Sequence, residues 1–116
     1  MLKMNDDLEG ALKMYIELLD KEKYFEAHEV LEEAWHPLRL KKDSLANLLK
    51  GLINAAIAFE HIKRNRKNSY FKAVKVMASY ERYKYKCIEG IPYDMLFMKA
   101  LQKVESLKQR HSIIFF

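Results

Sequence analysis

The stretch Gly51-Leu52-Ile53-Asn54-Ala55-Ala56-Ile57-Ala58-Phe59 decides the fold that this sequence predicts. Its residues are apolar almost all the way around a helix, and a helix of that kind belongs at the centre of a bundle. The helix is expected to begin after a cap at Asp43 or Ser44, whose side chains can accept a hydrogen bond from a free backbone N–H. It should continue to about Arg64, so one central helix organises the rest of the chain.

Four further helices are expected around the central one, because apolar residues recur at three- and four-residue spacing on both sides of it. Their expected limits are, in chain order, Asn5 or Asp6 to Asp20, Tyr24 to Pro37, Asn68 or Ser69 to Cys87, and Tyr93 or Asp94 onward. Pro37 should end or kink the second helix, since its ring removes a backbone donor. The sequence therefore predicts an all-α fold, a single-domain bundle of about five helices over residues 1–116.

The composition supports this fold and limits the setting in which the protein works. Half of the 116 residues are hydrophobic and 32% are charged, and only three glycines and two prolines occur. That composition favours long helices over a sheet with many turns. The single cysteine, Cys87, excludes an internal disulfide and fits a reducing compartment. Without a signal peptide or a membrane-spanning apolar run, we expect a cytoplasmic protein with no membrane partner.

Charge is distributed unevenly along the chain. Residues 1–35 hold ten acidic residues against four lysines, whereas residues 63–86 hold nine lysines and arginines against Glu81. Such a basic segment is most often a solvated face, but it can also mark a nucleic-acid or subunit contact. Tyr80, Tyr83 and Tyr85 alternate with its basic residues, and on a helix these positions scatter around the axis. No flat stacking platform results, which disfavours a nucleic-acid partner.

The helix over residues 24–35 carries a histidine and a carboxylate among aromatic residues. One side of it, which we expect to be buried, holds Tyr24, Phe25, His28, Leu31, Glu32 and Trp35. His28 and Glu32 lie four residues apart, so their side chains meet. On the central helix Asn54 and His61 share a face, because they are seven residues apart, and we expect that face to lie opposite His28 and Glu32.

An internal repeat indicates which of these positions the scaffold needs and which it does not. Residues 24–31 align with residues 70–77 at an offset of 46, with Tyr, Phe, Ala and Val identical. Each copy follows a helix and a short polar turn, which predicts two helical hairpins similar to those of tetratricopeptide repeats. Val74 and Ala78 stand where the first copy has His28 and Glu32. Packing alone therefore does not demand polar residues at these positions, which points to a functional site.

Three roles fit the polar cluster. His28, Glu32 and His61 are suitable ligands for a divalent metal, the only cofactor that the residues suggest. Alternatively, His28 and Glu32 form a catalytic acid–base pair in which the carboxylate orients the imidazole. The third role is a structural hydrogen-bond network.

Other residues are assigned around this cluster. Glu29, Trp35 and Asn54 are expected to complete a ligand-binding pocket, and His36 and His111 are expected to be exposed.

A family resemblance follows from two blocks of residues. The first block reads Phe-x-x-His-Glu-x-Leu-Glu-x-x-Trp, with Phe25, His28, Glu29, Leu31, Glu32 and Trp35 at the marked positions, and the second holds Gly51, Asn54 and His61. Both resemble an uncharacterised bacterial and archaeal family of small proteins, one of the domain-of-unknown-function families. That family commonly has glutamine in place of Asn54, and its usual Gly-Asn turn is replaced here by Arg66-Lys67-Asn68. The resemblance implies an all-helical single domain and brings no activity or cofactor.

Two functions follow from these observations. The first is a pocket for a small molecule or a divalent metal, with catalysis left open. The second is a non-enzymatic module that binds a protein partner, with Lys72, Lys75 and Arg82 offering a basic surface and the His28 cluster serving the fold. The apolar tail over residues 113–116 either docks on the domain or covers a patch between subunits. The second alternative would make the protein a homo-oligomer.

Overall fold

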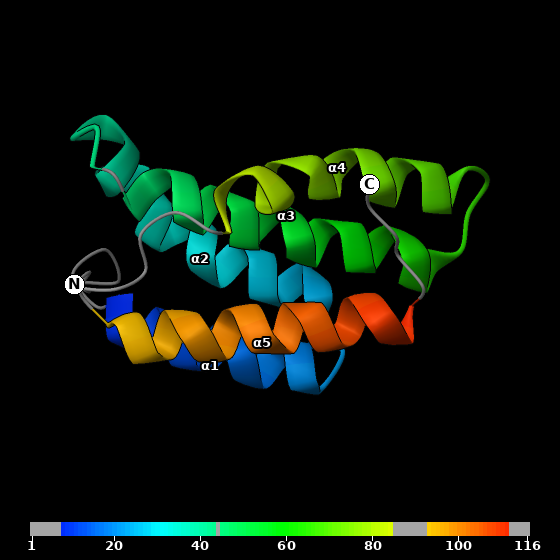
Figure 1. The fold of residues 1–116 in the computed structure, drawn as a ribbon, viewed down its shortest axis with the longest axis horizontal. Coiled ribbons are helices and arrows are strands. Elements are labelled where there is room, and N and C mark those ends of the chain that lie inside the picture. Colours follow the sequence, from blue (N-terminus) through cyan, green and yellow to red (C-terminus); the bar gives the residue numbers. More distant parts are fainter. Residues whose placement is uncertain (1–7, 44, 85–92, 112–116) are drawn as a thin grey trace.

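The structure, a computed structural model, describes residues 8–43, 45–84 and 93–111. These ranges form five α-helices and contain no strand (Figure 1). The helices are α1 (Leu8–Asp20), α2 (Tyr24–Leu40), α3 (Leu45–Arg64), α4 (Ser69–Tyr83) and α5 (Asp94–Arg110). The predicted all-α fold with about five helices is confirmed.

Helix α3 is the centre of the bundle. It packs against α2 on one side and α4 on the other, while α1 packs on α2, and α5 lies against α1 and α3. Figure 1 shows α4, α3 and α2 as successive neighbours, with α1 and α5 together at the opposite edge. The predicted central position of the apolar helix is therefore confirmed.

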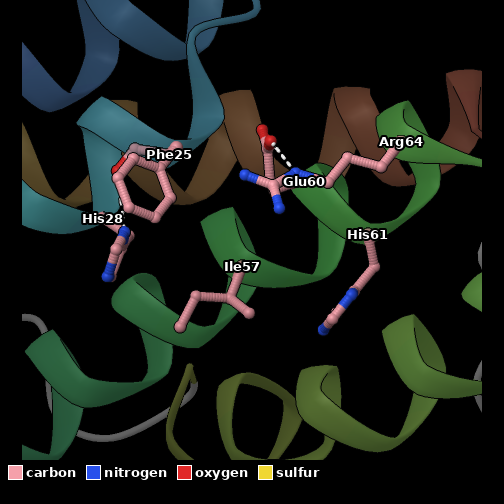
Figure 2. A pocket seen from close by; sticks show the side chains of 6 residues that line it. All are labelled: Phe25, His28, Ile57, Glu60, His61 and Arg64. Atoms are coloured by element: carbon pink, nitrogen blue, oxygen red, sulfur yellow. Dashed lines mark hydrogen bonds and ion pairs between the residues drawn. The ribbon is translucent and has the colours of Figure 1, made fainter.

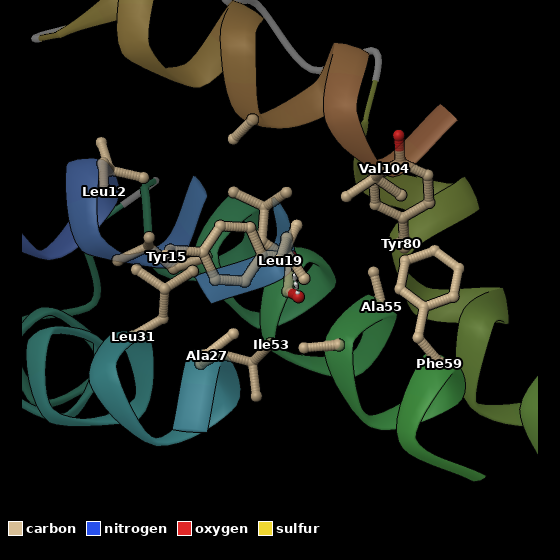
Figure 3. Packing of buried hydrophobic residues seen from close by; sticks show 14 of the residues in the cluster. Leu12, Tyr15, Leu19, Ala27, Leu31, Ile53, Ala55, Phe59, Tyr80 and Val104 are labelled. Carbon is tan, nitrogen blue, oxygen red and sulfur yellow. Dashed lines mark hydrogen bonds between the residues drawn. The ribbon is translucent and has the colours of Figure 1, made fainter. Parts of the chain in front are cut away.

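The core explains why α3 must be apolar on most sides. Between Leu45 and Phe59, every α3 residue is buried except four, which are Asn47, Lys50, Asn54 and Ile57. Side chains from all five helices meet around it, among them Tyr15, Leu31, Phe59, Tyr80 and Val104 (Figure 3). The hydroxyl of Tyr15 donates to the backbone oxygen of Leu52 at 2.7 Å, which satisfies a fully buried polar group. Burial raises the pKa of the Tyr15 hydroxyl far above its usual 10.

The observed ends of the helices match the predicted ends in part. The side chain of Asp43 caps α3, since its Oδ1 accepts from the N–H of Leu45 at 2.9 Å. Asn68 occupies the residue before α4 in a left-handed conformation, with φ of 64°, but its side chain makes no capping hydrogen bond. The start expected for the first helix at Asn5 or Asp6, Cys87, and the apolar tail over residues 113–116 lie outside the described residues.

Pro37 does not end the second helix, so that part of the prediction is wrong. Helix α2 continues through Pro37 to Leu40. A proline inside a helix removes one backbone donor. The carbonyl of Pro37 still accepts from the N–H of Lys41 at 3.1 Å, which closes the last turn.

Equivalent positions of the predicted repeat lie on α2 and α4. Ala27 and Ala73 are both fully buried, as are Leu31 and Met77, so α2 and α4 each turn these equivalent residues toward the core. Tyr24 is buried, however, whereas Tyr70 is half-exposed. Buried positions of this kind occur on any amphipathic helix, so the repeat and its likeness to tetratricopeptide hairpins stay predictions.

Part of the basic segment belongs to an ionic cluster between α4 and α5, which was not predicted from the sequence. Glu105 accepts from the Tyr80 hydroxyl at 2.7 Å and from Lys84 at 3.0 Å, and Lys108 joins Glu105 to Glu81. Burial alone would raise the pKa of Glu105, but the hydrogen bonds from Tyr80 and Lys84 and the charge of Lys108 lower it overall. Lys84 therefore serves the fold and is not part of a solvated basic face.

His111 is half-buried rather than exposed, which corrects the expectation for this residue. Its ring lies 5.8 Å from that of Phe59, and its Nε2 lies 3.3 Å from the hydroxyl of Tyr24. Burial and the nearby charge of Arg110 lower the pKa of His111 below its usual 6.5, while the carboxylate of Glu22 opposes this shift. The folded protein therefore favours the neutral imidazole.

This shift predicts a pH dependence of stability. Because the unfolded chain binds the His111 proton more readily, the contribution of His111 is complete above pH 6.5 and is lost as the pH falls through the folded pKa. Urea unfolding across this window should show a shallower loss for His111→Phe, which keeps a ring and removes the titration, than for the parent protein. The control is His36→Phe on the exposed side of α2. Equal pH slopes for the parent protein and His111→Phe would contradict the assignment.

None of the described helices is long and apolar enough to cross a membrane.

Candidate functional site

A pocket of about 220 Å³ lies between the start of α2 and the end of α3. Its lining residues are Phe25, His28, Ile57, Glu60, His61 and Arg64. Figure 2 shows Phe25 and His28 on α2 facing the α3 residues, with the two imidazoles on either side of Ile57. The pocket thus combines two apolar walls with two imidazoles, a guanidinium and a carboxylate.

Helix α2 presents these residues because its buried face is not the one that the sequence suggested. Its buried residues are Tyr24, Ala27, Leu31 and Ala34. Phe25 is 45% exposed and the Glu32 side chain is 47% exposed, so the prediction that both are buried is wrong. Because α2 packs against both α1 and α3, its small and aliphatic residues point between these helices, and Phe25, His28, Glu32 and Trp35 lie at the solvent edge beside α3.

His28 is held in one orientation by its own helix. Its Nδ1 donates to the backbone oxygen of Phe25 at 2.7 Å, since a carbonyl oxygen only accepts. The Nε2 atom then lies 3.6 Å from Oε1 of Glu32, and the side chain is 14% exposed. His28 and Glu32 are therefore neighbours, as predicted, and they lie at the solvent edge of the pocket. With its proton on Nδ1, the neutral imidazole keeps a lone pair on Nε2 that can accept a hydrogen bond or a proton.

Arg64 is held by two neighbours. Its Nε donates to Oε2 of Glu60 at 2.6 Å, and its guanidinium carbon lies 5.9 Å from the centre of the Phe25 ring. A guanidinium over an aromatic face is attracted by the negative charge of that face. Arg64 therefore has a defined position at the mouth of the pocket, with one nitrogen already paired.

The three residues predicted to complete a ligand pocket lie elsewhere. Asn54 donates from Nδ2 to the hydroxyl of Ser79 at 2.6 Å, so it faces α4 and not His28. Trp35 lies further along α2, where Lys50 sits 4.6 Å from its ring centre. Glu29 lies on the other side of α2, in a separate groove against α1. Glu29, Trp35 and Asn54 therefore do not line the pocket that contains His28.

The metal set is only partly assembled. His28 and His61 line the same pocket, and Glu32 lies beside His28. Within residues 8–43, 45–84 and 93–111, no group of three histidine, cysteine, aspartate or glutamate side chains is arranged to hold a metal ion. The geometry supplies no support for a metal bound by His28, Glu32 and His61.

Three pocket residues on α3 were not predicted from the sequence, namely Ile57, Glu60 and Arg64. A signal for two of them was present, because Lys50, Ile57 and Arg64 follow one another at seven-residue intervals and therefore share a line along the helix. That line meets α2, as the contacts of Lys50 with Trp35 and of Arg64 with Phe25 show. Glu60 joins the pocket four residues before Arg64, through an ordinary helical ion pair.

Comparison with known proteins places this chain in a family. Comparison with curated proteins and with solved structures found no match. A family model described as "Domain of unknown function (DUF309)" matches residues 12–72, which is more than half of the chain and includes every residue that lines the pocket. The chain belongs to the DUF309 family.

Proposed function

We propose that the pocket between α2 and α3 binds a small ligand that combines a flat or apolar part with an anionic group. The observation that carries this proposal is the convergence of Phe25 and Ile57 with His28, His61 and Arg64 around one cavity. Ligand sites are usually concave and largely apolar, with a few placed polar groups that fix orientation. This pocket has that composition.

Arg64 is the group that selects an anion. Glu60 pairs with Nε, which leaves the two Nη nitrogens to donate to a ligand oxygen pair. The ion pair and the Phe25 ring already orient the guanidinium, so little conformational entropy is lost when a ligand binds. The ligand therefore pairs its carboxylate or phosphate with Arg64 and lays its apolar part on Phe25 and Ile57.

The histidines add polar recognition. Because the Nδ1–H of His28 donates a hydrogen bond to the Phe25 carbonyl, the Nε2 lone pair can accept a hydrogen bond from a donor on the ligand. The same lone pair can accept a proton from a substrate, with Glu32 beside the ring to stabilise the imidazolium that forms. The catalytic roles predicted for His28 and Glu32 form part of this proposal, as a proton transfer that follows binding.

The proposal is tested with phenyl phosphate, which joins a flat ring to an anion. Arg64→Ala should weaken binding by about tenfold or more, because a hydrogen bond to a charged group contributes about 1.5–3 kcal/mol. Isothermal titration calorimetry measures the affinity, and the matched control is Arg110→Ala at the end of α5. His61→Ala should also weaken binding, with exposed His36→Ala as its control. Equal affinities in the pocket variants and their controls would refute the proposal.

A further inference from the structure

The pocket is one end of a longer polar face that runs along three helices. Residues at three- and four-residue spacing form a stripe on each helix. The α3 stripe is Asn47, Lys50, Asn54, Ile57, His61 and Arg64. The α2 stripe is Phe25, His28, Glu32, Trp35 and Arg39. The α4 stripe is Lys72, Lys75, Ser79 and Arg82. We name the three stripes together the α2–α3–α4 face.

Side-chain contacts show that the stripes are neighbours. On the α2 side, Lys50 lies 4.6 Å from the Trp35 ring and Arg64 lies 5.9 Å from the Phe25 ring. On the α4 side, Asn54 bonds Ser79 at 2.6 Å. The α3 stripe is therefore bordered by α2 along one edge and by α4 along the other. From residue 47 to residue 64 it is about 26 Å long, at 1.5 Å per helical residue.

The α2–α3–α4 face is strongly basic. Its cations are Arg39, Lys50, Arg64, Lys72, Lys75 and Arg82. The acid within the stripes is Glu32, and Glu60 beside the α3 stripe is already paired with Arg64. The other acids of α2, including Glu29 and Glu33, line the groove against α1 on its opposite side. Folding thus concentrates positive charge along one face.

Aromatic rings lie beside four of these cations, one of which is Arg82, 5.9 Å from the centre of the Tyr83 ring. Arg39 and Lys50 lie 5.1 Å and 4.6 Å from the centre of the Trp35 ring, and Arg64 lies over Phe25. Cations that are already oriented lose less side-chain entropy when they bind an anion. The rings thereby prepare a line of cations, from Arg39 and Lys50 at one end to Arg64 at the other, for a ligand with repeated negative charge.

We infer that the α2–α3–α4 face binds a single-stranded nucleic acid, with the phosphate backbone along the cations and one base in the pocket. This inference rests on the proposed function of the pocket. Proteins recognise unpaired bases with aromatic, histidine and arginine side chains, and Phe25, His28, His61 and Arg64 supply these types around one cavity. A base has both a flat face and a polar edge, which suits the apolar walls and the imidazoles. An acidic peptide would match the positive charge of the face, but it has no ring at each repeat to enter the pocket. A duplex also carries phosphates, but its bases are stacked inside and are not available to the pocket.

The test is fluorescence anisotropy with a labelled single-stranded RNA of about eight nucleotides, within the usual range for such sites. The variant Lys72→Ala/Lys75→Ala/Arg82→Ala removes the cations of the α4 stripe and should weaken binding at least tenfold. It should also reduce the slope of log K against log salt by about 2, since each phosphate contact on a single strand contributes about 0.7. The control Lys13→Ala/Lys21→Ala/Lys99→Ala removes the same charge from α1, the turn after it, and α5, and should change the affinity less than twofold.

Four outcomes would contradict the inference in whole or in part. Equal losses in the two triple variants would mean non-specific attraction to net charge. Polyglutamate or duplex RNA that competes as well as the single strand would mean an acidic protein or a duplex partner. Binding of phenyl phosphate without any binding of RNA would leave the proposed function intact and refute the nucleic acid alone. Conversely, RNA binding that is sensitive to the α4 triple variant and insensitive to Phe25→Ala would reject a base in the pocket.

Discussion

Phe59→Ala is expected to lower the free energy of unfolding by about 3–5 kcal/mol, the usual cost of removing a buried phenylalanine ring. Phe59 lies on the central helix with no exposed surface, and its ring centre is 5.5 Å from that of Tyr24 and 5.8 Å from that of His111. Residues of α2 and of the end of α5 would line the cavity that alanine leaves. These elements cannot all move inward, so most of the cost should persist.

Urea unfolding followed by circular dichroism measures this effect. Domains of this size are commonly stable by about 5–15 kcal/mol, so the substitution removes a large share of the total. The matched control is Phe71→Ala on α4, where the ring is 66% exposed. It should change stability by no more than about 0.5 kcal/mol. Similar losses for the two variants would show that Phe59 is not a central packing residue.

Gly51→Val is expected to destabilise the protein by about 1–3 kcal/mol, as overpacking usually does. A Cβ at Gly51 would lie 3.1 Å from the Cα of Tyr80 and 3.5 Å from the backbone oxygen of Ser79. Both are backbone atoms of α4, so the new side chain can be accommodated only if one helix shifts. Such a shift would also disturb the Asn54–Ser79 hydrogen bond three residues along α3.

The control for Gly51→Val is Asn47→Val, one turn earlier on the exposed side of α3. Helix propensity alone predicts that valine is more favourable than glycine by a few tenths of a kcal/mol. A loss of stability at position 51 therefore measures close packing and not an intrinsic preference of the backbone. Thermal and urea unfolding should agree on the sign, and a Gly51→Val protein as stable as the parent would contradict the close approach of α3 and α4.

The architecture was predictable because local rules and packing agree in this chain. The apolar run around Gly51 could be buried on nearly all sides only inside a bundle. The Asp43 cap and the end of the first helix at Asp20 also follow from local chemistry. Pro37 was expected to end or kink the second helix, because its ring removes a backbone donor, but α2 continues past it and the turn after it remains closed.

The site was predictable only where one helix decided it. His28 and Glu32 had to be neighbours, because residues four apart on a helix always are. Asn54 was assigned to the same cluster on the ground that it shares a face with His61. On α3 that face is wide enough to border two helices, and Asn54 lies at its α4 edge. Helical periodicity gives the direction of a side chain around its own helix axis. It does not say which neighbouring helix lies in that direction.

The sequence by itself determined the helices, the central place of α3 and the identity of the polar residues on each helix. The tertiary structure decided which side of α2 is covered by α1 and α3, so Phe25 is exposed beside Arg64, while Trp35 packs at the edge of the core beside Arg39 and Lys50. It also brought the stripes of α2, α3 and α4 onto one face. The physical reason is that burial depends on the directions of all neighbouring helices, whereas helical periodicity is a property of each helix alone.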